Sequence, residues 1–151
     1  MANVTTTQLL KDHTKGWSVK LTNESDGTAE SAVTKIDASA LVTANGGSAE
    51  RLTITKILWN VSSGASPTAE PRITLHWSGD APNTIVTLSG SGSWDLTTNL
   101  QAPLTNATAN TNGDILLSTV NFTDGAAYTV ILEGRKVLGY TSREVTDDGI
   151  A

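Results

Sequence analysis

The chain has 151 residues and a formal net charge of −5, from 10 lysines and arginines against 15 aspartates and glutamates. Nucleic-acid binders need a basic surface to neutralise phosphates, so this acidic balance predicts no nucleic-acid partner. The chain has no cysteine, which excludes disulfides, thiolate metal ligands and a cysteine nucleophile. Only 17% of the residues are charged, and the many threonines and serines favour β-structure over helices.

The first 16 residues are rich in threonine and contain two isolated leucines, Leu9 and Leu10. They offer little apolar area to bury, so we predict an N-terminal arm over residues 1–16 that is mobile in solution and orders against a neighbour. Within it, Gln8–Lys15 could form one helical turn. The start of the chain resembles no secretory signal, and no apolar run is long enough to span a membrane, so we expect no membrane partner.

Short runs of alternating apolar and polar residues predict a single β-domain over residues 17–140. The strongest run is Arg51–Asn60. There we place Leu52, Ile54 and Leu58 on one face, and Ile57 and Trp59 on the other. The remaining predicted strands are 17–22, Ser31–Asp37, Arg72–Trp77, Thr84–Ser89, Ser93–Thr97, Asp114–Thr119 and Ala127–Glu133.

Turn-forming clusters of Asn, Asp and Gly separate these runs, and no long window has a helical period. The expected fold is therefore all-β: an antiparallel β-sandwich, jelly-roll-like, with extended arms at both termini. Gly90–Trp94 is expected to contain a hairpin turn. The loop Asn99–Asn112 is long for a compact domain, and residues 141–151 form a polar, acidic C-terminal tail.

The titratable residues do not predict catalysis. His13 lies in the expected arm, and His76 lies between Leu75 and Trp77, where alternation directs it away from the core and towards solvent. The acidic residues are scattered among separate segments, so no pair of carboxylates and no metal cluster is indicated. We therefore expect no enzyme, no cofactor and no metal.

The tryptophans indicate where a partner could bind. Trp17, Trp59 and Trp77 lie in predicted strands, where large aromatic side chains usually belong to the core. Trp94 follows a Gly-Ser turn and is the one we expect to be partly exposed. Exposed aromatic and aliphatic side chains anchor protein contacts, so Trp94, Leu9 and Leu10 are the predicted partner-contact residues.

Four segments between Ile54 and Glu133 together resemble a known class of protein: ITKILWNVSS, ITLHWSGD, IVTLSGSGSWDL and GDILLSTVNFTDGAAYTVILE. They are similar to small virion structural proteins of tailed bacteriophages, including capsid decoration (cement) proteins of cyanophage-like viruses. The pattern consists of strands and turns and contains no catalytic signature.

This resemblance implies a non-enzymatic protein, commonly a homotrimer, which assembles in the host cytoplasm. It would bind the outer capsid surface of the virion, where it would bridge and stabilise major capsid protein subunits. Two alternatives stay open: another virion component, such as a tail, neck or fibre-associated β-domain, or a carbohydrate-binding module that uses Trp94.

Overall fold

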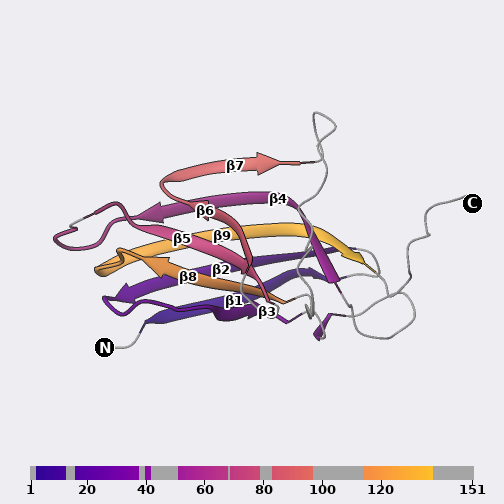
Figure 1. The fold of residues 1–151 in the computed structure, drawn as a ribbon, viewed down its shortest axis with the longest axis horizontal. Coiled ribbons are helices and arrows are strands. Elements are labelled where there is room, and N and C mark those ends of the chain that lie inside the picture. The colour runs from indigo at the N-terminus through magenta and orange to yellow at the C-terminus, as the bar shows by residue number, and fades with distance from the viewer. Residues whose placement is uncertain are drawn as a thin grey trace, which may run out of the picture.

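The computed structural model describes residues 3–12, 16–37, 40–41, 51–67, 69–78, 83–96 and 114–137. Two antiparallel sheets account for the strands of these residues, with the orders β1-β2-β9-β4-β7 and β3-β8-β5-β6. In Figure 1 the strands run along the long axis of the molecule, with β7 at one edge. The strands are β1 (Val4–Asp12), β2 (Gly16–Asp26), β3 (Val33–Ile36), β4 (Arg51–Ser62), β5 (Arg72–Trp77), β6 (Asn83–Leu88), β7 (Ser91–Asp95), β8 (Ile115–Val120) and β9 (Asp124–Val137).

The core lies between the two sheets and is built by the alternation that the sequence predicts. In β5, Ile73, Leu75 and Trp77 are all buried, and the residues between them are half-buried. Trp17 and Leu21 of β2 belong to the same core and are fully buried. The predicted all-β class and the two-sheet antiparallel architecture are therefore confirmed.

The predicted faces of β4 are wrong at Leu58, which is 49% exposed although Leu52 and Ile54 are buried. The ladder between β4 and β9 has a β-bulge between Ile54 and Lys56. An extra residue in one strand reverses the alternation that follows it. Ile57 therefore enters the core, and Leu58 turns outwards.

The N-terminal segment also differs from the expectation. Residues Val4–Asp12 form β1, which pairs antiparallel with β2. The predicted helical turn is therefore wrong over residues 8–12, and the expected mobile arm over residues 1–16 contains a strand of the sheet. Backbone pairing with β2 outweighs the weak local preference for a helix. The rest of the predicted turn with His13, the loop Asn99–Asn112 and the tail 141–151 lie outside the described residues.

The connection after β6 is a corner between sheets, where the sequence predicts a hairpin turn. Strands β6 and β7 belong to different sheets, so they cannot form a hairpin. Gly90 has a φ of +62°, which favours glycine, and its carbonyl accepts a hydrogen bond from the Val61 amide at 2.6 Å. These two features guide the chain from one sheet to the other.

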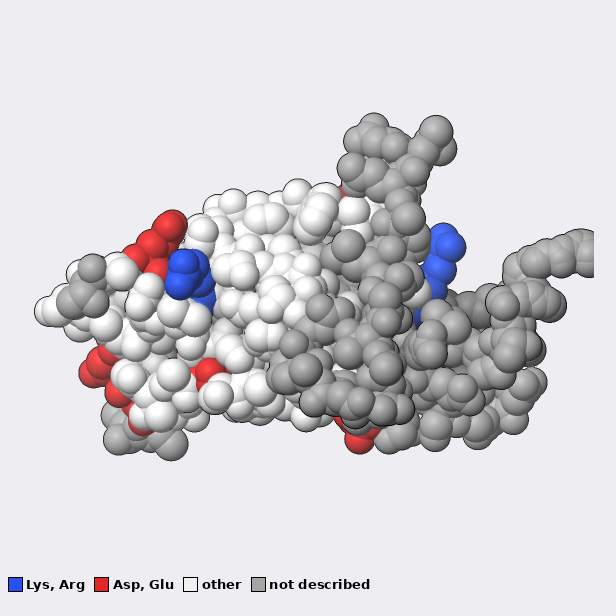
Figure 2. Space-filling view, viewed as in Figure 1, with Lys and Arg blue, Asp and Glu red and all other residues white. Residues whose placement is uncertain are grey.

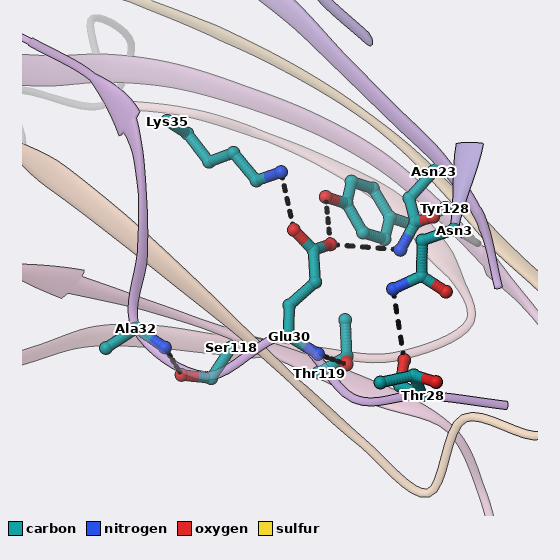
Figure 3. A network of polar contacts seen from close by, with 9 residues as sticks. All are labelled: Asn3, Asn23, Thr28, Glu30, Ala32, Lys35, Ser118, Thr119 and Tyr128. Atoms are coloured by element: carbon teal, nitrogen blue, oxygen red, sulfur yellow. Dashed lines mark hydrogen bonds and ion pairs between the residues drawn. The ribbon is translucent and has the colours of Figure 1, made fainter. Parts of the chain in front are cut away.

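A buried polar network joins the two sheets (Figure 3). The Glu30 carboxylate lies in the connection between β2 and β3 and accepts hydrogen bonds from Asn23 Nδ2 at 2.9 Å and from the Tyr128 hydroxyl at 2.8 Å. Its other oxygen pairs with the buried ammonium of Lys35. The Glu30 backbone exchanges hydrogen bonds with Thr119 of β8. Both charges are satisfied internally, as buried charges must be.

Candidate interaction surface

The three predicted partner-contact residues are exposed and lie on one sheet. Leu9 and Leu10 are 53% and 47% exposed on β1, and Trp94 is 37% exposed on β7. Strands β1 and β7 are the two edges of the five-stranded sheet, with β2, β9 and β4 between them. The structure therefore does not bring these residues into one patch. It places apolar side chains at two opposite edges.

Strand β1 extends beyond the core. Every side chain from Val4 to Lys11 is exposed, so neither face of this strand is covered by the other sheet. Its position depends on the ladder with β2 and on a side-chain contact at its start. The Asn3 side chain donates a hydrogen bond to the Thr28 carbonyl at 3.1 Å and accepts one from the Asp26 amide at 2.9 Å.

The edge at β7 is ordered by Trp59 of the neighbouring strand. Trp59 Nε1 donates a hydrogen bond to the Ser89 carbonyl at 2.9 Å. Its ring lies against Gly92, where an added Cβ would come within 2.7 Å of the Trp59 ring. Trp94 is opposite the buried Ile57 in the ladder. Alternation therefore directs the Trp94 side chain to the core side of the sheet, at its uncovered edge.

The sequence did not predict that Leu58 would take part in this surface. Leu58 is opposite Ile131 in the β4–β9 ladder, on the outer face of the sheet. These two side chains lie in a shallow groove of about 400 Å³ that is also lined by Lys56, Ser93 and Asp95. Only the bulge brings Leu58 to this face, and nothing in the sequence of β4 alone signals it.

A row of charged side chains crosses the same outer face. In the ladders, Lys11 is opposite Ser18, Ser18 is opposite Glu133, Glu133 is opposite Lys56, and Lys56 is opposite Asp95. Lys11 Nζ lies 2.9 Å from Glu133 Oε2, and Lys56 Nζ lies 3.7 Å from Glu133 Oε1 and 3.8 Å from Asp95 Oδ2. The hydrogen bond from Lys11 is the main cause that lowers the pKa of Glu133. The charges in this row largely compensate one another.

The outer face of the four-stranded sheet mixes polar and apolar side chains. In the β5–β8 ladder the half-buried Thr74, His76 and Ser118 lie beside the half-buried Leu116 and Val120. Figure 2 shows a broad area on one face of the molecule without Lys, Arg, Asp or Glu. His76 points away from the core, as its position between Leu75 and Trp77 predicts, and its Nε2 lies 3.2 Å from the Ser118 hydroxyl. The expected exposure of the His76 ring to solvent is wrong, because its Nδ1 is buried. His76 is half-buried, and this burial lowers the pKa of its imidazole.

No group of three or more His, Cys, Asp or Glu residues gathers in a metal-binding arrangement within the part of the chain that the structure describes. Within the same part, no helix is long and apolar enough to cross a membrane. Among the described residues, the surface of this two-sheet protein has exposed apolar side chains at two edges of one sheet and a shallow groove between β4, β7 and β9.

The two sheets make the chain an antiparallel β-protein, with exposed apolar side chains at both edges of its five-stranded sheet. No protein-family model matches the chain, and no curated protein is similar enough to count as a relative.

Proposed function

We propose that this chain is a capsid decoration protein of a tailed bacteriophage. It binds the outer surface of the head after assembly in the host cytoplasm, and it bridges and stabilises major capsid protein subunits. The observation that carries the proposal is the exposure of apolar side chains at both edges of one sheet, Leu9 and Leu10 on β1 and Trp94 on β7. A rigid subunit with one contact at each edge touches two neighbours at once.

The strand order supports the finer assignment of the fold as a jelly roll. Without β1, the sheets have the orders β2-β9-β4-β7 and β3-β8-β5-β6. In one sheet the first of these eight strands, β2, pairs with the last, β9, and in the other sheet the second strand, β3, pairs with the second last, β8. Eight strands wound as two Greek keys would give this arrangement. Jelly rolls are common in viral capsid and lectin domains. Because one fold hosts many functions, this supports a virion role only in combination with the surface.

The chemistry of the outer face suits a hydrated protein contact. The row from Lys11 to Asp95 is electrically balanced. Further along the same face, beyond the row of Leu58 and Ile131, Thr22 and Thr129 form a pair of hydroxyl side chains. Such groups form direct and water-mediated hydrogen bonds with little desolvation of charge. Each contact can be weak, because a subunit that holds two neighbours gains from the effective concentration of the second site.

Binding to expanded heads tests the proposal. Purified protein is added to expanded heads that lack it, and we measure the bound fraction and the temperature at which the heads open. We expect saturable binding and a higher opening temperature. Trp94→Ala should weaken binding about tenfold or more, because truncation of an aromatic anchor costs about 2 kcal/mol. The matched control is Val33→Ala, which shortens an exposed side chain on the other sheet.

Absence of binding, or binding without any change in the opening temperature, would overturn the proposal. A tail, neck or fibre-associated role predicts binding to those structures and none to heads. A carbohydrate-binding role predicts saturable quenching of tryptophan fluorescence by polysaccharides that is lost in Trp94→Ala. That role needs the Trp94 ring as a stacking platform, and Trp94 is one of the residues that line the groove with Leu58 and Ile131, so the fluorescence titration separates the two roles.

A further inference from the structure

We propose that β1 pairs edge to edge with β1 of a second copy of this chain, so that two five-stranded sheets join into one. Strand β1 has β2 as its only neighbour in the described sheet. Along the other edge of its segment Val4–Leu10, no strand of the described residues pairs with the backbone. An edge of this kind is a template for pairing with another chain.

This edge lacks the usual protection. Natural proteins shield edge strands with charges, proline, short length or a covering element. The segment Val4–Leu10 reads VTTTQLL, with no charge, no proline and no glycine, and its side chains are exposed on both faces. A β-bulge between Leu9 and Lys11 disturbs only the end of the strand. Six consecutive residues from Val4 to Leu9 therefore remain in regular pairing with β2.

The other edges are better protected. Strand β3 has only four residues, and one of them is Lys35. Strand β7 has five residues and ends in Asp95. Strand β6 is uncharged as well, but its Ile85 and Val86 pack against the core, and it is shorter than the nine-residue β1.

A second copy is the occupant that the sequence of β1 favours. The chain carries a net charge of −5, yet two uncharged segments can approach without local repulsion. Antiparallel pairing about a two-fold axis keeps each face of the sheet continuous. A register centred on Thr7 places Thr7 opposite its own copy and Thr5 of each chain opposite Leu9 of the other, all within the regular part of the strand. Such cross-strand pairs stabilise a ladder.

Both ends of β1 are already fixed, which lowers the entropic cost of pairing. Asn3 bonds to the backbone at Asp26 and Thr28 at the start, and Lys11 pairs with Glu133 near the end. The pairing is isologous and closes at two copies. The joined sheet would then have strand β7, with its exposed Trp94, at each of its two outer edges. In such a dimer the neighbour at the β1 edge is the second copy, and the two Trp94 edges remain for contact with capsid subunits. The pairing itself does not depend on capsid binding, because it concerns the purified chain alone.

Sedimentation equilibrium over a range of concentrations tests the inference. We expect the wild-type chain to form a dimer. Thr7→Lys and Thr7→Glu each place two like charges at the two-fold axis, so each variant alone should raise the dimer dissociation constant about tenfold or more, the effect of about 1.4 kcal/mol. An equimolar mixture of the two variants should recover the dimer, because opposite charges then face each other. This recovery cannot be explained by misfolding.

The matched control is Thr129→Lys, which makes the same substitution at an exposed threonine of β9 inside the sheet. It should dimerise like the wild type. A wild-type chain that is monomeric at every concentration, or a trimer as the phage resemblance implies, would overturn the inference. So would unchanged association of Thr7→Lys, or a variant mixture that stays monomeric while near-ultraviolet circular dichroism shows both variants folded.

Discussion

The Tyr128 hydroxyl donates a hydrogen bond of 2.8 Å to Glu30 Oε1 and thereby ties β9 of one sheet to the segment that leads into the other (Figure 3). Glu30 is 7% exposed, and the Lys35 side chain that pairs with it is 6% exposed. Such a network constrains how the two sheets pack, because each buried polar group depends on the others for its partner.

Replacing Glu30 by Gln should strongly destabilise the chain. The substitution keeps the size of the side chain but leaves the Lys35 ammonium buried without its counter-charge, and breaking a buried pair in this way costs about 3–5 kcal/mol. The free energy of unfolding in urea measures the effect. Glu24→Gln, at an exposed position of β2, serves as the control and should change stability by less than about 0.5 kcal/mol. Equal effects at both positions would contradict the network's role.

Tyr128 should make the chain sensitive to alkali. Burial is the main cause that raises the pKa of its phenol above the usual 10.0, and the Glu30 charge adds to it. A pKa that is higher in the folded than in the unfolded chain contributes stability below pH 10.0, and this contribution is lost as the pH rises further.

The wild-type chain should therefore lose stability above pH 10.0 more steeply than Tyr128→Phe. Urea midpoints measured from neutral pH to about pH 11 compare the two chains across the ordinary tyrosine range. Parallel pH profiles would show that the Tyr128 phenol ionises as easily in the folded chain as in the unfolded one.

Leu75 and Thr74 test the register of β5. Leu75 is fully buried, and its neighbour Thr74 is half-buried on the opposite face. Leu75→Ala leaves a cavity and should cost about 2–5 kcal/mol, whereas Thr74→Ala should cost less than about 1 kcal/mol. Chemical unfolding of both variants measures the difference. Similar losses would place the two side chains on equivalent faces and contradict the register.

Gly134 has no room for a side chain. A Cβ at this position would overlap the Thr53 carbonyl oxygen and would lie 2.9 Å from the Trp17 ring. Gly134→Ala must shift backbone as well as side chains, so it should cost about 1–3 kcal/mol or more. Thermal unfolding reports the loss. Thr129→Ala, on an exposed position of the same strand, should be nearly neutral, and an equally mild effect of Gly134→Ala would contradict the close packing.

The sequence predicted the strands well wherever alternation is uninterrupted. In β5 each residue keeps its predicted face. The ladders of β5 with β6 and with β8 have no register shift from Ile73 to Leu75. In β4 the prediction failed after Ile54, because the bulge arises in the ladder with β9 beside Gly134. A bulge depends on two strands that are far apart in sequence, so the pattern of one strand does not reveal it.

The sequence also predicted only part of the candidate surface, because some of its residues are brought there by contacts between distant strands. Leu9, Leu10 and Trp94 stood out as large apolar side chains in polar surroundings, and all three are exposed. Leu58 was missed because its exposure depends on the bulge. Glu30 was missed as well, since the buried network gathers residues from separate strands and leaves no local pattern in the sequence.

The stoichiometry of this chain in purified virions tests the central claim most directly. Virions of a phage that encodes it are analysed by quantitative mass spectrometry, with the major capsid protein as the internal reference. A decoration protein that bridges capsid subunits should be present in copy numbers comparable to those of the major capsid protein. Absence from the virion, or the few copies typical of a neck or tail component, would contradict the account.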